Sequence, residues 1–157
     1  MLIKNLVDED FCNYKKPSMF IIFPMCDFKC DREAGCSICQ NSQLAHLPNI
    51  EISKEDIVQR YLNNPITSAV VMGGLDPMMS LPDLHTLVKE FRKYTNDDIV
   101  IYTGYKEDEY PYQWEYLTRF PNIIIKFGRF IPNQESRYDE ILGVKLASPN
   151  QYARRIS

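Results

Sequence analysis

The chain lacks a long hydrophobic run, and this absence excludes a membrane-spanning helix. Its longest uninterrupted apolar stretch covers only residues 19–23 and ends at Pro24, whereas a span requires about 20 residues. The N-terminal segment carries no apolar signal region and soon reaches the acidic run 8–10. We therefore expect a cytoplasmic protein with no membrane partner.

A large excess of charge of either sign is also missing. The net charge is −3 in 157 residues, which gives no electrostatic reason to expect binding to nucleic acid or to an anionic membrane. Hydrophobic residues make up 45% and charged residues 25% of the sequence, as in ordinary globular domains that are large enough to bury a core. No internal repeat, low-complexity segment or linker divides the chain, so we expect one domain over residues 1–157.

Histidine is scarce, and cysteine is absent after residue 39. The two histidines, His46 and His85, stand at no metal-binding spacing. Four of the five cysteines fall within residues 26–39, in the pattern Cys26-x3-Cys30-x5-Cys36-x2-Cys39, and Cys12 stands alone. In a chain without a secretion signal, clustered thiols bind metal more often than they form disulfides. For Cys12 we expect a structural thiol.

Short apolar runs alternate with amphipathic segments along the rest of the chain. This order predicts βαβ units and a mostly parallel sheet of about five strands. A closed eight-stranded barrel requires about 250 residues, so we expect an open, partial (βα) barrel with the cysteine loop after the first strand. The expected strands are 19–23, 68–72, 99–102, 123–126 and 141–146, and the expected helices are 54–62, one from Pro82, and 111–119.

The expected strands end in glycine or cysteine segments. The cysteine loop follows the first strand, Gly73-Gly74 the second, Thr103-Gly104 the third and Gly128 the fourth. Because the carboxyl ends of parallel strands meet at one edge of a sheet, these segments are expected to form the ligand site together.

The cysteine spacing allows three kinds of site, because thiolates are soft ligands that select iron–sulfur clusters or zinc. All four thiols can hold a structural zinc, all four can hold an electron-transfer cluster, or three can hold a cluster with one open iron. Zinc sites usually separate their cysteine pairs by about 15–20 residues, but only five residues separate Cys30 from Cys36. An open iron would be able to chelate the amino and carboxylate groups of a ligand.

Several segments together resemble the radical S-adenosylmethionine superfamily. More closely, the chain resembles the activating enzymes of anaerobic (class III) ribonucleoside-triphosphate reductases, over nearly its whole length. No single motif is specific, and the resemblance depends on their order and separation. The segments that carry it are 26–30, 39–41, 71–77, 101–105, 126–130 and 147–151.

The cysteine motif departs from the superfamily pattern, Cys-x3-Cys-x2-Cys. Cys26 and Cys30 fit its first two positions, but an insertion at 31–38 displaces the third. Cys39 is the better third ligand, because the Gln-Asn pair after it matches the family. Cys36 lies inside the insertion and is expected to be a bystander.

The resemblance implies two cofactors, a 4Fe–4S cluster on Cys26, Cys30 and Cys39, and S-adenosylmethionine. It implies reductive cleavage to a 5′-deoxyadenosyl radical and formation of a glycyl radical on the large subunit of the reductase. The electron would come from a donor such as flavodoxin or ferredoxin. No catalytic residue is expected beyond the cluster ligands. The residues that the resemblance assigns to S-adenosylmethionine are Gly73, Gly74, Asp76, Thr103, Gly104, Asn150 and Gln151.

One departure from the family pattern and two further expectations accompany this assignment. Leu75 stands between the glycine pair and Asp76, where the family usually has an acidic residue directly after the pair. A side chain at Gly74 is expected to block the ligand without unfolding the domain. The short chain leaves few residues for a lid, so the partner's surface is expected to complete the cavity. The alternative from another class is a small, non-catalytic interaction module stabilised by a four-cysteine zinc site.

Overall fold

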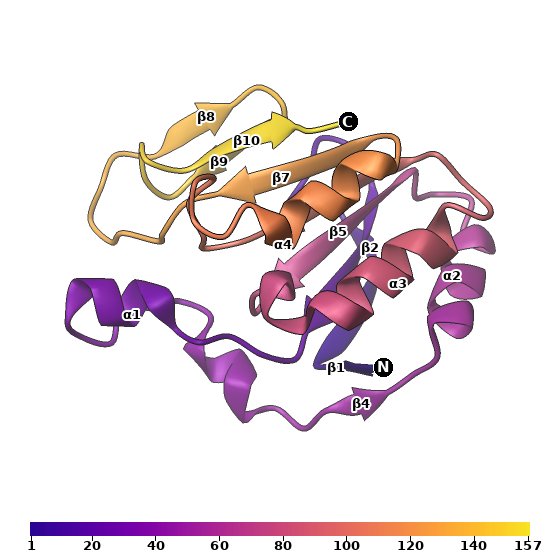
Figure 1. Cartoon of the computed structure of the whole chain (residues 1–157), viewed down its shortest axis with the longest axis horizontal. Coiled ribbons are helices and arrows are strands. Elements are labelled where there is room, and N and C mark those ends of the chain that lie inside the picture. The colour runs from indigo at the N-terminus through magenta and orange to yellow at the C-terminus, as the bar shows by residue number, and fades with distance from the viewer.

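The computed structural model describes all 157 residues and shows an α/β fold around one open six-stranded sheet (Figure 1). The strand order is β10-β7-β6-β5-β3-β2. The four inner strands are parallel to one another, and both edge strands run antiparallel to their neighbours. The strands are β2 (Asn5–Asp10), β3 (Ser18–Phe23), β5 (Ala69–Gly74), β6 (Asp98–Tyr102), β7 (Ile123–Phe127) and β10 (Tyr152–Arg155).

The remaining elements are short helices and two small antiparallel pairs of strands. The α-helices are α1 (Lys29–Ala34), α2 (Lys54–Leu62), α3 (Leu81–Phe91) and α4 (Tyr112–Glu115), and the 3-10 helices are η1 (Ser42–His46), η2 (Pro77–Ser80) and η3 (Tyr116–Arg119). The pairs are β1 (Leu2–Ile3) with β4 (Ile50–Glu51), and β8 (Arg137–Asp139) with β9 (Val144–Leu146). None of the helices combines the length and apolar character needed to cross a membrane.

Helix α2 begins and ends where the sequence predicts. The side chain of Ser53 accepts a hydrogen bond from the backbone N–H of Asp56 at 3.0 Å, which satisfies one of the free donors of the first turn. The buried face of the helix consists of Ile57, Val58 and Tyr61. Leu62, which the spacing also places on this face, is 40% exposed because the helix ends there.

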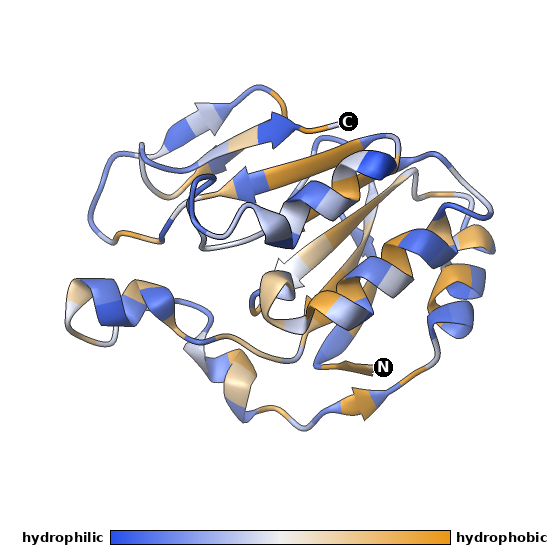
Figure 2. Ribbon diagram, viewed as in Figure 1, coloured by the Kyte–Doolittle hydropathy of each residue, from blue (hydrophilic) through white to orange (hydrophobic).

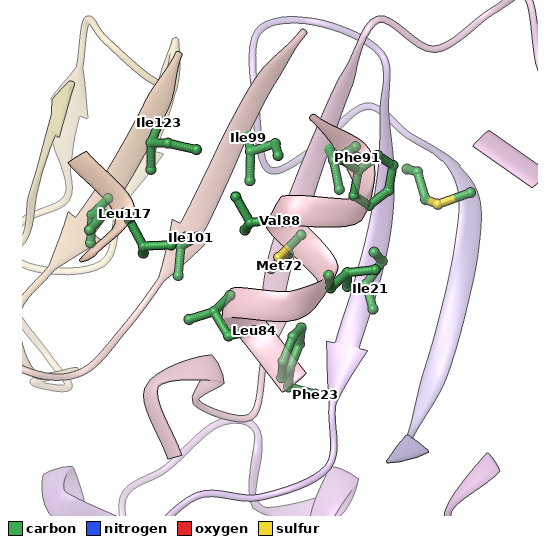
Figure 3. Close-up of a cluster of buried hydrophobic side chains, with 14 of the residues drawn as sticks. Ile21, Phe23, Met72, Leu84, Val88, Phe91, Ile99, Ile101, Leu117 and Ile123 are labelled. Atoms are coloured by element: carbon green, nitrogen blue, oxygen red, sulfur yellow. The ribbon is translucent and has the colours of Figure 1, made fainter. Parts of the chain in front are cut away.

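The main core lies on one face of the sheet, under α2, α3 and the α4–η3 segment. In Figure 3, Leu84, Val88 and Phe91 of α3 point toward side chains of the central strands. Figure 2 shows the corresponding hydropathy, with largely hydrophobic β5 and β7 behind helices that mix both characters. Helices α2, α3 and α4 therefore cover the same face, whereas α1 lies in the cysteine segment beyond the carboxyl end of β3.

The opposite face has no helical cover. A smaller core there packs Tyr14, Leu142 and Leu146 against the alternate side chains of the strands. These three residues come from the segment before β3 and from the β8–β9 hairpin region. Toward the carboxyl ends of the strands, this face borders the cavity described below.

Neither edge strand is among those expected from the sequence, and the sheet has six strands rather than about five. Strand β2 alternates half-buried and exposed residues, and β10 is largely polar, so neither forms the continuous apolar run typical of a buried strand. The strand expected at 141–146 is confined to β9, which pairs with β8 outside the main sheet. The cysteine segment, expected to be a loop, contains α1 and η1. The sheet is open and does not close into a barrel.

A matched pair of leucine substitutions tests the helix-covered core. Leu84→Ala should lower the free energy of unfolding by about 2–5 kcal/mol, because it removes a fully buried side chain. Leu62→Ala makes the same chemical change at the exposed end of α2 and should stay within about 0.5 kcal/mol of the parent. Urea unfolding measures both values, and comparable losses would contradict the assignment of the buried face.

Candidate metal centre

Three of the clustered cysteines line one cavity of about 390 Å³ at the carboxyl ends of the parallel strands. The strand ends expected to meet there do contribute to its wall. The predicted site residues that line it are Cys26, Cys30, Cys39, Gly74, Asp76, Thr103, Gly104 and Gln151. Gly73 and Asn150, also predicted, are not among the lining residues.

Backbone N–H groups point at two of the cavity sulfurs. Phe28 donates to Cys26 Sγ and Phe130 donates to Cys30 Sγ, each at 3.3 Å. Phe28 adopts a left-handed conformation (φ 51°) at the start of α1. Hydrogen bonds of this kind stabilise thiolates and adjust the potential of a bound cluster.

Cys39 is positioned through its backbone. The Asp31 carboxylate accepts hydrogen bonds from the N–H groups of Ile38 at 2.9 Å and of Cys39 at 2.8 Å. The insertion at 31–38 therefore folds back on itself and returns Cys39 to the cavity. Cys36 is exposed and lies outside the cavity lining, with its Sγ 3.8 Å from the carbonyl oxygen of Ala34.

The arrangement of the thiols indicates which kind of metal group can bind here. No set of three or more His, Cys, Asp or Glu side chains is grouped to hold a single metal ion. Burial raises the pKa of the Cys26 thiol, partly offset by Lys29 and the Phe28 N–H, and burial likewise raises the pKa of the Cys39 thiol. A metal group that binds here must therefore displace thiol protons. The residues present fit a 4Fe–4S cluster: three thiols share one cavity, and N–H donors face two of the sulfurs.

A buried ion pair ties the cysteine segment to the sheet. Lys29, inside the Cys26–Cys30 spacing, lies 2.7 Å from Asp76 Oδ2, and the two side chains are 2% and 4% exposed. The ammonium also lies 2.7 Å from Asp27 and 4.0 Å from the centre of the Tyr105 ring. Burial alone lowers the pKa of Lys29, but the two carboxylates outweigh this effect and raise it. The lysine is therefore charged at all physiological pH values.

Asp76 is the centre of a hydrogen-bond network rather than a free acidic group. Its Oδ2 accepts from the Thr103 hydroxyl at 2.9 Å and from the Gly104 N–H at 3.0 Å, and its Oδ1 accepts from the Met78 N–H at 3.0 Å. The polar groups of Thr103 and Gly104 assigned to a ligand by resemblance are thus already engaged by Asp76. Contact of these residues with S-adenosylmethionine remains a prediction, and the contacts seen here show them positioning Lys29 and the cysteine segment.

Two further contacts hold the cysteine segment against the strand ends. Asn41 Nδ2 donates to the Gly74 carbonyl oxygen at 3.0 Å. Arg129 pairs with Glu33 of α1 at 2.6 Å and with Glu109 at 2.7 Å. The roles of Lys29 and Arg129 could not be predicted, because a charged residue that is buried by tertiary contacts leaves no pattern in the sequence. The one sequence feature that points to a role for Lys29 is its position between two predicted ligands.

The glycine pair serves the fold as well as the cavity. Gly74 has φ +80°, and a Cβ there would stand 2.5 Å from Ile22 Cγ2. A Cβ at Gly73 would stand 3.2 Å from Tyr102 Cβ. A side chain at Gly74 therefore also strains the fold, because its Cβ collides with the Ile22 side chain of β3. That it blocks a ligand without unfolding the domain stays a prediction.

Asn150 and Gln151, near the C-terminus, lie in different environments. Gln151 is buried, and its Oε1 accepts from the Ala147 N–H at 3.1 Å. Asn150 is exposed, and its Nδ2 donates to the Arg129 carbonyl oxygen at 2.9 Å. Gln151 can therefore face a ligand in the cavity, whereas Asn150 supports the segment that carries Arg129.

The chain supplies more of the cavity wall than its length suggests. Ser136 and residues 144–147, from the β8–β9 region, line the cavity together with Cys12 and Asn13. The hairpin is fixed in place, because the Leu142 carbonyl accepts from the Lys15 N–H at 2.7 Å. This cover revises the expectation that few residues remain to close the site. Cys12 is exposed at the cavity and is not part of the core.

A comparison with protein families gives one match. The family described as 4Fe-4S single cluster domain matches residues 18–151, which include the cysteine segment, the four parallel strands and every candidate site residue. No curated protein and no solved structure matches the chain.

Two substitutions test whether the buried ion pair positions the cysteine segment. Lys29→Met leaves the Asp76 carboxylate buried without its counter-ion, and we expect a loss of about 3–5 kcal/mol in unfolding free energy. Arg32→Met on the same helix removes a side chain that is 66% exposed and pairs with Asp27, so the expected loss is about 0–1 kcal/mol. Urea unfolding and hydrogen exchange over residues 26–41 measure the effect. Equal behaviour of the two variants would show that the pair has no such role.

A pair of glycine substitutions separates backbone strain from steric collision. Gly35→Ala and Gly74→Ala both place a side chain at positive φ, which costs about 1–3 kcal/mol. A Cβ at Gly35 meets nothing within 4 Å, whereas one at Gly74 meets Ile22. Gly74→Ala should therefore lose clearly more unfolding free energy in the metal-free protein. If Gly74→Ala proves the milder of the two, the contact with β3 does not constrain the strand end.

Proposed function

Because the chain belongs to the family of 4Fe–4S single cluster domains, we propose that Cys26, Cys30 and Cys39 hold its cluster and leave one iron without a protein ligand. The observation that carries this proposal is the division of the four clustered thiols. Three line one cavity and Cys36 lies on the exposed surface. A site built for four protein ligands would need Cys36 to turn inward.

The ligand proposed for the open iron is S-adenosylmethionine. The cavity of about 390 Å³ falls in the range of small-molecule sites, roughly 300–1,000 Å³. It extends from the thiols past the strand ends to Gln151 and to the β8–β9 region, so it has room for a ligand beside the metal. The motifs that resemble the radical S-adenosylmethionine superfamily supply most of this wall.

The distribution of helices supports a partial-barrel interpretation of the sheet. In a doubly wound sheet helices cover both faces, whereas in a (β/α) barrel they form an outer layer only. Here α2, α3 and α4 share one face, and the cavity opens on the other at the carboxyl ends of the strands. We propose that the sheet is a barrel segment whose inner face carries the site.

The protein's own residues position the cofactors and shield the site. When bound, the cluster supplies one electron to the sulfonium of S-adenosylmethionine, and the cofactors carry this chemistry. Phe28 and Phe130 N–H groups hold the sulfurs of Cys26 and Cys30, and the Lys29–Asp76 pair fixes the segment between them. The β8–β9 region covers the cavity on the side away from the helices and so limits the access of water.

The proposed reaction is activation of an anaerobic ribonucleoside-triphosphate reductase. The resemblance to reductase activating enzymes supports a glycyl radical on the large reductase subunit as the product, with flavodoxin or ferredoxin as electron donor.

Anaerobic reconstitution of a cysteine series tests the proposal. Cys26→Ala, Cys30→Ala and Cys39→Ala should each lose most of the bound iron and sulfide, whereas Cys36→Ala should retain both and still form 5′-deoxyadenosine from S-adenosylmethionine and dithionite. Adding the reductase should then produce a glycyl-radical signal by electron paramagnetic resonance.

Each contrary outcome removes a different part of the proposal. Loss of iron in Cys36→Ala and its retention in Cys39→Ala would reverse the assignment of the third ligand. Zinc without iron would favour the non-catalytic interaction module. Deoxyadenosine formation without any glycyl radical on the reductase would leave the cofactors in place and refute the partner.

A further inference from the structure

Lys126 is a buried cation in the cavity wall that no carboxylate neutralises. It lies in β7 in register with Tyr102 of β6, is 7% exposed and lines the same cavity as the three cysteines. Its Nζ donates to the Gly128 carbonyl oxygen at 3.1 Å. No Asp or Glu oxygen lies within 4.0 Å of Lys126 Nζ, the limit for an ion pair. The ammonium therefore has one hydrogen bond and no counter-ion.

The neighbouring charges do not supply the missing partner. Asp76 is already matched by Lys29 and by the N–H and O–H groups described above. Burial lowers the pKa of Lys126 to about 8, and the negative charges of Asp76 and Cys30 oppose this shift. A buried ammonium without a counter-ion is unfavourable, and an anion bound in the cavity would offset this cost.

The segment that carries Lys126 points toward Cys30. Lys126 is fastened to Gly128, and two residues later the Phe130 N–H donates to Cys30 Sγ at 3.3 Å. One short segment thus places a backbone N–H at Cys30 Sγ and a positive charge in the wall of the same cavity. Both features stabilise negative charge on the metal group bound there.

We propose that Lys126 is the counter-charge of the iron–sulfur cluster and raises its reduction potential. This inference rests on the proposed cluster site. Three thiolates give the bound group a negative charge that grows when the cluster accepts one electron, and a nearby ammonium stabilises the reduced form more than the oxidised form. The lysine acts as a positioning residue through the positive charge of its ammonium.

The test measures the midpoint potential of the reconstituted cluster without S-adenosylmethionine. In a dithionite titration followed by electron paramagnetic resonance, dithionite is oxidised and the cluster gains one electron. Lys126→Met should shift the reduction equilibrium at least tenfold toward the oxidised cluster, a lowering of about 59 mV for a one-electron couple, with the iron content unchanged. Lys126→Arg keeps the charge and should remain close to the parent.

Lys145→Met is the matched control. Lys145 also lines the cavity but is exposed, so water screens its charge and its removal should leave the potential unchanged. If Lys126→Met does not fold, Lys126→Gln removes the charge and keeps an N–H donor for Gly128.

The outcomes separate this inference from the proposed function. A parent protein that binds no iron refutes the cluster site itself. A full cluster with an unchanged potential in both Lys126→Met and Lys126→Gln refutes the inference alone. An unchanged potential together with weaker S-adenosylmethionine binding would instead assign Lys126 to the ligand's carboxylate and would also overturn it.

Discussion

The ion pair between Lys29 and Asp76 is the interaction on which the site depends. It joins the middle of the cysteine motif to the residues that follow β5, and through Thr103 and Gly104 it reaches the end of β6. It acts together with the Asn41–Gly74 and Arg129–Glu33 contacts, which also hold this segment and its six-residue helix at the sheet. A buried pair contributes little net stability compared with apolar packing, but loss of one partner is costly. Its value here is positional, because it holds the residue before Cys30 against the ends of β5 and β6.

The two faces of the sheet have different roles in the fold. Helices cover one face and supply the main apolar core, while the other is covered by the segment before β3 and the β8–β9 hairpin. This asymmetry leaves a polar cavity at the strand ends without weakening the core. Its wall contains several buried polar side chains that engage one another, and Lys126, which lacks a counter-ion. Residues that line the cavity therefore alternate with core residues along the same strands.

The sequence was sufficient for the parts of the fold that depend on local pattern. The parallel strands, helix α2 and the convergence of the strand ends on the cysteine segment follow from apolar runs, helical spacing and the polarity of βα units. The edge strands β2 and β10 could not be predicted in this way, because an edge strand buries only part of its surface and carries polar residues. The roles of Lys29, Arg129 and Lys126 arise from burial by distant segments. The constraint at Gly74 depends on Ile22 in the adjacent strand, a contact that no spacing in the sequence encodes.

The central claim is that one iron of the cluster has no protein ligand, and Mössbauer spectroscopy of protein reconstituted with iron-57 tests it most directly. The account predicts that added S-adenosylmethionine changes the isomer shift and quadrupole splitting of a single iron subsite and leaves the other three unchanged. A spectrum that is identical with and without the ligand, in a fully loaded cluster, would contradict it.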